Sequence, residues 1–511
     1  MSKYYITTAI DYVNSVPHLG HAYEKTLADT MARWRRLKGD DVYFLLGLDE
    51  HSQKVADKAA ELKLDPLRYC DEMEGKFREA WTKLNITFDV FIRTTWPSHV
   101  RACQEIFRRI RAKGDVYKAL YKDLYCVGCE ASKKEPELVN GRCPNHPTTP
   151  IQRIEEENYF FRLSKYADRV KALLQRGDFI DPPFRTNEML QVIEQGLQDI
   201  SISRRTTKWG VPIPDDPDQV MYVWFDALIN YATGAGFPDE PDRFQRTWPA
   251  DCHVIGKDIT RFHTVIWPAM LLAADIEPPK FCAVHGFVTL KGEKISKSQG
   301  NAIYPMDIAD HYGADSLRYF LLAEVAFGQD GDFTWEKFYA RFNSELADKL
   351  GNLLSRIVSM VEKYCAGAFA GPREALPSDA GLRAQVLDAA NAVPALLDRW
   401  QFHTALAEIM KAVTSTNGYI EAVAPWKLAK QGRTAAVANC LYQAAEALRI
   451  LTILLSPVLP ASALKTMEQL GLDASALRLD ASRTWEGIPD GTRVKKGPVL
   501  FPKIDAGAAK A

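Results

Sequence analysis

The stretch KYYITTAIDYVNSVPHLGHAYEKTLADTMARWRRLKGDDVYFLLGL (residues 3–48) decides the fold of this chain. Its first residues, KYYITTA, are β-branched and aromatic and predict a buried strand. Residues 19–38 then repeat apolar side chains at helical spacing, and DVYFLLGL (41–48) predicts a second strand. A strand, a long helix and another strand in this order predict a parallel sheet of the doubly wound, Rossmann-like kind.

Beyond this unit the composition and pattern of the sequence change twice. Residues 116–150 are polar and rich in Cys, Gly and Pro, and from about residue 340 amphipathic helical patterns dominate. Sheet-like runs resume between these regions, at 220–225, 252–256 and 280–285. We therefore predict four parts: an α/β domain at 1–115 and 222–290, an inserted domain at 116–221, a loop and linker at 291–340, and a helical bundle at 341–511.

The composition describes a soluble globular protein. The 511 residues are 47% hydrophobic and 25% charged, and this length favours three or four domains. No apolar run is long enough to span a membrane, and the start MSKYYITTAI lacks a signal-peptide layout, so we expect a cytoplasmic protein with no membrane partner. Nine cysteines, an odd number, favour reduced thiols. With a net charge of −1, any nucleic-acid binding must rely on local basic patches.

Reactive side chains follow the predicted strands, which is where a doubly wound sheet binds its ligands. The first strand leads into His18-Leu19-Gly20-His21 at the start of the helix. Two imidazoles three residues apart can hydrogen-bond phosphate oxygens beside a helix N-terminus, and the glycine lets a base lie against the backbone. Taken alone, this motif is equally typical of two histidines that cap a helix.

A second motif follows the run at 280–285. The loop KGEKISKSQG (291–300) holds Lys294 and Lys297 between two glycines, and such a loop can close ammonium groups over a triphosphate. Taken alone, it is typical of an exposed loop. Both motifs after strands, in this order, predict nucleotide chemistry.

HLGH and KISKS resemble the HIGH and KMSKS signatures of class I aminoacyl-tRNA synthetases. Four longer segments are similar to the methionyl-tRNA synthetase family, and the resemblance covers nearly the whole chain: TTAIDYVNSVPHLGH (7–21), GLDEH (47–51), VWFDALINY (223–231) and GKDITRFHTVIWPAML (256–271). The resemblance implies that L-methionine reacts with ATP and Mg²⁺ to give methionyl-adenylate and pyrophosphate. The methionyl group then passes to the 3′ end of tRNA(Met) and AMP is released.

The resemblance also assigns residues to the two small substrates. ATP is expected at His18, His21, Glu24, Gly256, Asp258, Lys294 and Lys297, with His18, His21, Lys294 and Lys297 as the catalytic set. Methionine is expected at Ala9, Ile10, Tyr12, Asp49, Trp224, Leu228, Tyr231, Ile259 and His263. Asp49 would hold the ammonium group, and aromatic edges suit a polarizable thioether. Without the resemblance, Trp224 and Tyr231 are typical of a core. Leu228, Ser52 and Ile295 depart from the pattern of many relatives.

Two cysteine-containing pairs lie in the insertion. Cys126-x-x-Cys129 is followed by Cys143-x-x-His146, a spacing that predicts a closed tetrahedral site for one structural Zn²⁺. A disulfide between Cys126 and Cys129 is the alternative, and the second pair disfavours it. The resemblance implies that this knuckle belongs to an insertion that packs over the active site and receives the acceptor end of the RNA.

In the bundle, the resemblance implies that Asn352, Arg356, Pro425 and Trp426 contact the anticodon, with Trp426 as a platform for an unstacked base. From the residues alone, Trp426 is equally typical of a core and Asn352 of an ordinary surface. Some relatives carry a further C-terminal RNA-binding and dimerising domain. This chain ends soon after the bundle, so we expect a monomer.

Three other functions fit part of the pattern. A class I synthetase for cysteine or a branched aliphatic amino acid is the nearest, but the range 115–222 is too short for the editing domain of the isoleucine, valine and leucine enzymes. A small-molecule nucleotidyltransferase shares the HxGH motif and would lack the zinc knuckle and the bundle. A non-catalytic RNA-binding paralogue is disfavoured by the intact His18, His21, Lys294 and Lys297.

Overall fold

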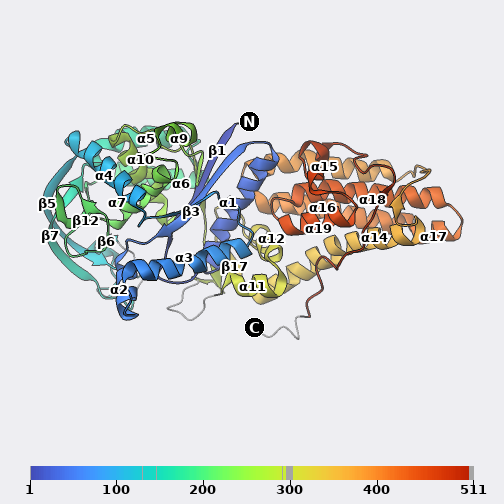
Figure 1. The fold of residues 1–511 in the computed structure, drawn as a ribbon, viewed down its shortest axis with the longest axis horizontal. Coiled ribbons are helices and arrows are strands. Elements are labelled where there is room, and N and C mark those ends of the chain that lie inside the picture. Colours follow the sequence, from blue (N-terminus) through green and yellow to red (C-terminus); the bar gives the residue numbers. More distant parts are fainter. Residues whose placement is uncertain (1, 129–130, 145–146, 291, 295–302, 506–511) are drawn as a thin grey trace.

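A computed structural model describes residues 2–128, 131–144, 147–290, 292–294 and 303–505 (Figure 1). The molecule is elongated, with an α/β half at one end and a helical bundle at the other. The prediction of an α/β domain followed by a bundle is confirmed. No helix in the described part of the chain is long and apolar enough to cross a membrane.

The centre of the α/β half is a seven-stranded sheet. Its strands are β1 (Lys3–Thr8), β2 (Asp11–Tyr12), β3 (Asp41–Asp49), β4 (Val90–Arg93), β8 (Ile180–Asp181), β13 (Cys252–Gly256) and β14 (Cys282–His285). The order is β2-β3-β1-β13-β14-β8, with β4 also on β3, and every pairing is parallel. Because β3 lies on one side of β1 and β13 on the other, the strand order reverses beside β1. Ligands bind at such a reversal in doubly wound sheets.

The insertion carries two antiparallel sheets. One has the order β6-β5-β7-β9 and the other β10-β12-β11. Their strands are β5 (Val116–Cys126), β6 (Ala131–Lys133), β7 (Gln152–Phe161), β9 (Ile200–Ser201), β10 (Ser203–Arg204), β11 (Pro212–Ile213) and β12 (Asp216–Met221).

Two expectations about this region need correction. Strand β8 lies inside the range 116–221 that we assigned to the insertion, yet it pairs with β14 in the central sheet. A two-residue strand has no periodicity, so the sequence holds no signal for it. The predicted strand at 220–225 is also wrong in its second half, because Val223–Leu228 forms helix α7. A short apolar run does not distinguish a strand from a buried helix.

Helices cover both faces of the central sheet. They are α1 (Leu19–Leu37), α2 (Gln53–Glu61), α3 (Pro66–Lys83), α4 (Pro97–Ala112), α5 (Ala167–Gln175), α6 (Pro183–Glu194), α7 (Val223–Leu228), α8 (Asn230–Gly234), α9 (Pro241–Thr247) and α10 (Trp267–Ala273). The pleat divides the core in two. Phe44 and Leu46 pack in the cluster that contains α1 and α3, whereas Leu45 between them packs with α4, α8 and α10.

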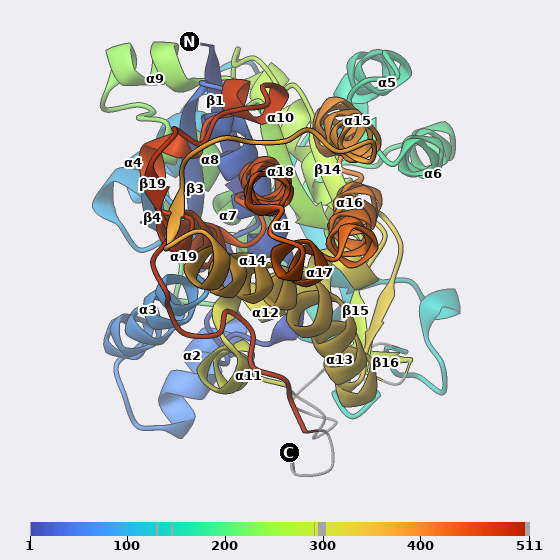
Figure 2. The same cartoon turned by 90° about the vertical axis from the view of Figure 1, so that its right-hand side faces the viewer.

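The bundle continues the core on the α1 side of the sheet. Its helices, with those that connect it to the sheet, are α11 (Pro305–Tyr312), α12 (Ala314–Glu324), α13 (Trp335–Arg341), the π-helical η6 (Phe342–Gly351), α14 (Asn352–Tyr364), α15 (Asp379–Asp398), α16 (Phe402–Val423), α17 (Pro425–Lys430), α18 (Thr434–Leu455) and α19 (Pro460–Gln469). Figure 2 shows α18 end-on with the other helices around it, and nearly all of its residues are buried.

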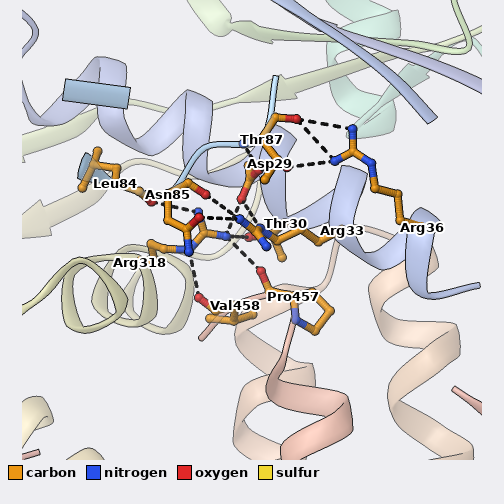
Figure 3. A network of polar contacts seen from close by, with 10 residues as sticks. All are labelled: Asp29, Thr30, Arg33, Arg36, Leu84, Asn85, Thr87, Arg318, Pro457 and Val458. Carbon is orange, nitrogen blue, oxygen red and sulfur yellow. Dashed lines mark hydrogen bonds and ion pairs between the residues drawn. The ribbon is translucent and has the colours of Figure 1, made fainter. Parts of the chain in front are cut away.

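A buried ion pair joins the α/β half to the bundle (Figure 3). Asp29 on α1 lies 2.7 Å from the guanidinium of Arg318 on α12, and both side chains are fully buried. Arg318 also donates to the carbonyl oxygens of Pro457 and Val458, in the turn between α18 and α19, at 2.9 Å each. Burial alone would raise the pKa of Asp29, but Arg318 and Arg33 outweigh it and the pKa is lowered.

We expect Arg318→Met to lower the free energy of unfolding by about 3–5 kcal/mol, because it leaves the Asp29 carboxylate buried without its main partner. Urea unfolding of the whole chain measures the loss. Lys503→Met is the matched control, since its partner Asp348 and Lys503 itself are 53% and 65% exposed. The control should lose no more than about 1 kcal/mol. Equal losses in both variants would contradict the role of Arg318.

Candidate active site

The N-terminus of α1 is closed by the two histidines of the HLGH motif. The backbone N–H of Gly20 donates to His18 Nδ1 at 3.1 Å, and the backbone N–H of His18 donates to His21 Nδ1 at 3.2 Å. The two rings stack with their centroids 3.9 Å apart. A neutral imidazole that accepts at Nδ1 carries its proton on Nε2. Each ring therefore keeps one Nε2–H donor, as the phosphate-binding role requires.

The surroundings keep this arrangement in place. Burial lowers the pKa of His21 well below its ordinary value, and the neighbouring His18 and the Lys25 charge lower it further. A Cβ atom at Gly20 would lie 3.0 Å from the His18 ring, so a side chain there would push that ring away. Capping and phosphate binding, which we treated as alternatives, are thus compatible: the Nδ1 atoms cap the helix, and each neutral ring carries its proton on Nε2.

The residues predicted to contact the nucleoside come together beside this helix. Glu24 Oε2 lies 3.1 Å from His285 Nε2, at the end of β14. Gly256 ends the neighbouring strand β13, and a Cβ there would lie 2.9 Å from Asp258 Oδ1 and 3.7 Å from the His285 ring. Glu24 and His285 are buried, whereas Asp258 is exposed. The ends of β13 and β14 thus meet the first turns of α1.

An aromatic cluster lies on the other side of β1. Tyr12 meets Trp224 edge to face, with ring centroids 6.5 Å apart, and Trp224 stacks on Phe262 at 3.9 Å. His263 lies edge-on to Trp224 at 6.4 Å. The structure therefore brings together three of the residues predicted for methionine, although they come from three separate segments.

The remaining methionine residues lie close to this cluster in the fold. Strand β2 pairs Tyr12 with Asp49, the buried last residue of β3. Ala9 and Ile10 connect β1 to β2, and Leu228 is buried one helical turn after Trp224.

The hydrogen bonds of His263 define its tautomer. His263 Nδ1 lies 3.0 Å from the carbonyl oxygen of Ile259, which can only accept, so Nδ1 carries the proton. Nε2 then accepts from the hydroxyl of Tyr231 at 2.7 Å. Burial lowers the pKa of His263 to about 4, so the ring is neutral at physiological pH.

The structure describes the residues that flank the KISKS loop on both sides. Strand β15 (Val288–Leu290) pairs with β16 (Glu293–Lys294) and with β17 (Gly331–Phe333). Residues 295–302, which include Lys297, lie outside the described part of the chain, and only the backbone of Lys294 is described. The carbonyl oxygen of Ile303, directly after the segment, accepts from Leu19 N–H of the HLGH motif at 3.1 Å. This bond joins the HLGH motif to the chain that follows the KISKS loop.

Two of the four predicted zinc ligands are described. Cys126 ends β5, and Cys126 and Cys143 are both fully buried. Among the described residues of 127–150, Cys143 alone is buried. A thiol buried in such an exposed segment fits a metal ligand. Cys129 and His146 lie outside the described residues.

The residues predicted for RNA contact lie at the far end of the bundle. Asn352 is exposed at the start of α14, and Arg356 one turn later pairs with Glu421 on α16 at 2.6 Å. Pro425 is buried and Trp426 half-buried at the start of α17, which Figure 1 places at the end of the bundle away from the sheet.

Comparison with known proteins identifies the family to which this combination of fold and motifs belongs. A family model described as class I tRNA synthetases (M) matches residues 4–151 and 137–358, and one described as the anticodon binding domain of methionyl tRNA ligase matches 370–510. The chain belongs to the methionine–tRNA ligase family. The resemblance seen in the sequence is thereby confirmed.

Relatives match over almost the whole chain. The methionine–tRNA ligases of Caldanaerobacter subterraneus subsp. tengcongensis and Thermotoga maritima are 44% and 42% identical to it, over 98% and 99% of this chain and 79% and 81% of theirs. The structure of Mycobacterium tuberculosis methionyl-tRNA synthetase with methionyl-adenylate has a TM-score of 0.94 at 42% identity and covers 98% of this chain and 100% of that one. The apo form has a TM-score of 0.87 at 40% identity and covers 99% of each.

One buried carboxylate connects two groups of the residues predicted to bind methionine. Asp226, two residues after Trp224, accepts from His51 Nδ1 and from His99 Nε2 at 2.7 Å each. His51 is two residues after Asp49, so Asp226 braces the chain directly after the end of β3. Burial alone would raise the pKa of Asp226, but the two imidazoles outweigh it and the pKa is lowered. His51 ends the GLDEH segment and His99 lies outside the quoted segments, but no sequence pattern linked either histidine to Asp226, so the sequence did not reveal this network.

The same carboxylate lies in a group with the spacing of a metal site. Potential ligand atoms of His99, Cys103 and Asp226 lie within 4.8 Å of one another. These atoms already contact one another, with His99 Nε2 3.2 Å from Cys103 Sγ and 2.7 Å from Asp226 Oδ1. The group is a hydrogen-bonded network in this structure, and it is separate from the predicted zinc knuckle.

The neutral, buried His263 predicts a pH dependence of stability. Its pKa is below the ordinary 6.5, so between about pH 6.5 and 4 the unfolded chain binds a proton that the folded chain does not. Over that range this group should lower the free energy of unfolding by about 1.4 kcal/mol per pH unit as the pH falls. Urea unfolding at several pH values should show a shallower fall in His263→Gln. The control His311→Gln removes an exposed imidazole, and its free energy of unfolding should change with pH as in the original chain. If the curves of His263→Gln and the original chain are parallel, His263 is not the group responsible for this pH dependence.

Proposed function

We propose that methionine and ATP react at the ends of β1, β3, β13 and β14, between the aromatic cluster and the N-terminus of α1. As a member of the methionine–tRNA ligase family, the chain activates L-methionine with ATP and charges tRNA. The single observation that carries the location is the hydrogen bond between Leu19 N–H and the carbonyl oxygen of Ile303, which joins HLGH to the part of the chain that follows KISKS.

The reaction needs positioning and charge stabilisation rather than a protein nucleophile. A carboxylate oxygen of methionine attacks the α-phosphorus of ATP, the bond to the β-phosphate oxygen breaks, and pyrophosphate leaves with the electron pair. The N-terminus of α1 and the Nε2–H groups of His18 and His21 would bind phosphate oxygens as charge builds. Lys294 and Lys297 would neutralise the leaving pyrophosphate, and Mg²⁺ would enter with ATP.

The second step transfers the methionyl group. A hydroxyl oxygen at the 3′ end of tRNA(Met) attacks the carbonyl carbon of the adenylate, and the bond to the phosphate oxygen breaks to release AMP. The enzyme must therefore hold the adenylate while the RNA end enters. Glu24, Gly256 and Asp258 would retain the nucleoside during this step.

Methionine would bind by its two ends. The Asp49 carboxylate would hold the ammonium group in a charge-assisted hydrogen bond, and the aromatic cluster with Leu228, Tyr231 and His263 would enclose the thioether. The neutral state of His263 supports this, because an imidazolium would be unfavourable beside an apolar side chain.

Two further sites complete the proposal. Cys126, Cys129, Cys143 and His146 would hold one structural Zn²⁺ that stabilises the insertion; the burial of Cys126 and Cys143 supports it. Asn352, Arg356, Pro425 and Trp426 would contact the anticodon. The ion pair of Arg356 with Glu421, near the end of α16 and just before α17, supports a shared surface. A cytoplasmic monomer remains our prediction.

We expect methionine to be the amino acid that best promotes exchange of pyrophosphate into ATP when the purified chain is tested across the twenty amino acids. Lys297→Ala should slow this exchange at least tenfold, because charge on the leaving pyrophosphate is less stabilised. Methionine binding, measured by calorimetry, should stay within about twofold because the lysine acts on the phosphates. Exchange with a different amino acid, or no exchange at all, would refute the proposed function.

Trp426→Ala should weaken charging of tRNA(Met) by about tenfold, which corresponds to the loss of one base–aromatic stacking contact. The exchange reaction should be unchanged because the anticodon takes no part in it. Measuring both reactions on one preparation makes exchange the internal control. Equal loss of both activities would contradict an anticodon role and indicate a core tryptophan.

A further inference from the structure

Lys25 is a completely buried lysine on α1, and all three protons of its ammonium group are used. Nζ donates to Asp11 Oδ1 at 2.7 Å, to Glu24 Oε1 at 2.8 Å and to the carbonyl oxygen of Ala9 at 2.9 Å. The side chain is 0% exposed. No motif in the sequence singled out Lys25 or Asp11.

The three acceptors belong to two different parts of the site. Ala9 lies between β1 and β2, Asp11 is the first residue of β2, and the next residue, Tyr12, pairs with Asp49. The segment 9–12 and Asp49 form the methionine side of the proposed function. Glu24 lies on the ATP side, and its other oxygen is 3.1 Å from His285. One ammonium group thus connects the methionine side to the ATP side.

The charges at this point favour one arrangement. Burial opposes the charged state of Lys25, but Asp11 and Glu24 outweigh it and the pKa of Lys25 is raised. Burial raises the pKa of Asp11 to about 7; Lys25 opposes this rise and the nearby Glu24 adds to it. Without the ammonium group, two buried carboxylates would face each other and one would take up a proton.

A purely structural role is the alternative. A buried ion pair adds little net stability compared with apolar packing, because both charges lose their hydration. If position 25 served only to fill the core, a leucine or methionine would pack there equally well. The three hydrogen bonds instead fix the direction of the Ala9 carbonyl, the Asp11 carboxylate and the Glu24 carboxylate together.

We propose that Lys25 is a positioning residue that holds the methionine-side segment 9–12 and the ATP-side carboxylate of Glu24 in one arrangement. This rests on the proposed function. Neither substrate touches Lys25. When methionine orders the segment 9–12, Lys25 and with it Glu24 are held in place for ATP, and the reverse applies when ATP binds first. Binding of either substrate therefore strengthens binding of the other through Lys25.

The test is calorimetric titration of methionine into the whole chain, with and without a non-hydrolysable ATP analogue and Mg²⁺. The original chain should bind methionine at least about fivefold more tightly with the analogue present. In Lys25→Met, which keeps the length of the side chain, this ratio should fall to about one, and KM for methionine and for ATP should both rise in the exchange assay.

Two further variants separate positioning from stability. Arg449→Met removes the buried cation of an ion pair on α18, far from the site. The Arg449 guanidinium lies 2.8 Å from the Glu446 carboxylate, and their side chains are 2% and 0% exposed. It should lower thermal stability as Lys25→Met does and leave both KM values and the ratio unchanged. Asp11→Asn keeps the Lys25–Glu24 pair and nearly the same shape. It should reduce the ratio and raise KM for methionine more than KM for ATP, and it serves as the test if Lys25→Met does not fold.

The ratio compares methionine affinity with and without the ATP analogue. The proposal is overturned if this ratio in Lys25→Met or Asp11→Asn equals that of the original chain. It is also overturned if Arg449→Met changes the ratio as much as Lys25→Met does. Absence of methionine-dependent exchange in the original chain would overturn the proposed function, and this inference with it. Normal exchange in the original chain together with normal coupling in the variants refutes the role of Lys25 alone.

Discussion

The active site depends on how the first turn of α1 satisfies its backbone N–H groups. A helix N-terminus has donors without helical partners and a partial positive charge, so it attracts phosphate. In this chain the Nδ1 atoms of His18 and His21 accept two of these N–H groups, and Ile303 accepts a third. The same bonds orient both imidazoles and hold Ile303, which follows the KISKS loop, at the helix. Capping, ring orientation and the attachment of Ile303 thus share one set of hydrogen bonds.

Helix α1 then carries buried charges along its length, and each charge connects it to another part of the molecule. Lys25 reaches Ala9 before β2 and Asp11 in β2, and Glu24 reaches β14. Asp29, about one turn further on, pairs with Arg318 of α12, which contacts the turn between α18 and α19. Buried ion pairs define geometry more than they add net stability. The helix that presents the phosphate site is therefore also the helix that fixes the bundle to the sheet.

The pleat of the central sheet explains why the residues proposed to bind the two substrates lie on opposite sides of β1. Alternate residues of β1 and β3 enter separate cores, one containing α1 and the bundle and the other α7, α8 and α10. Glu24 belongs to the first side, and Trp224, Tyr231 and His263 to the second. The two sets meet only at the strand ends, where β2 continues beside β3 and pairs Tyr12 with Asp49. Asp226 on α7 braces this meeting point from one side of the sheet, and Lys25 on α1 braces it from the other.

The sequence by itself determined the features that depend on short spacing. The first strand, the helix at 19–37, the HLGH and KISKS motifs and the paired cysteines all follow from residues a few positions apart, so a local pattern contains their signal. Strand β8 was missed because two residues have no period. The run at 220–225 was misassigned because short buried helices and strands share their composition.

Only the tertiary structure decided how these elements are held together. His51 and Asp226 are 175 positions apart, and Lys25 finds Asp11 because β1 and α1 pack side by side. Arg318 meets Asp29 across two domains. A buried charge is recognisable only with its partner, and the partner is chosen by the packing of whole elements. Local spacing therefore identified the chemistry, and long-range pairing of buried polar groups determined the geometry in which it takes place.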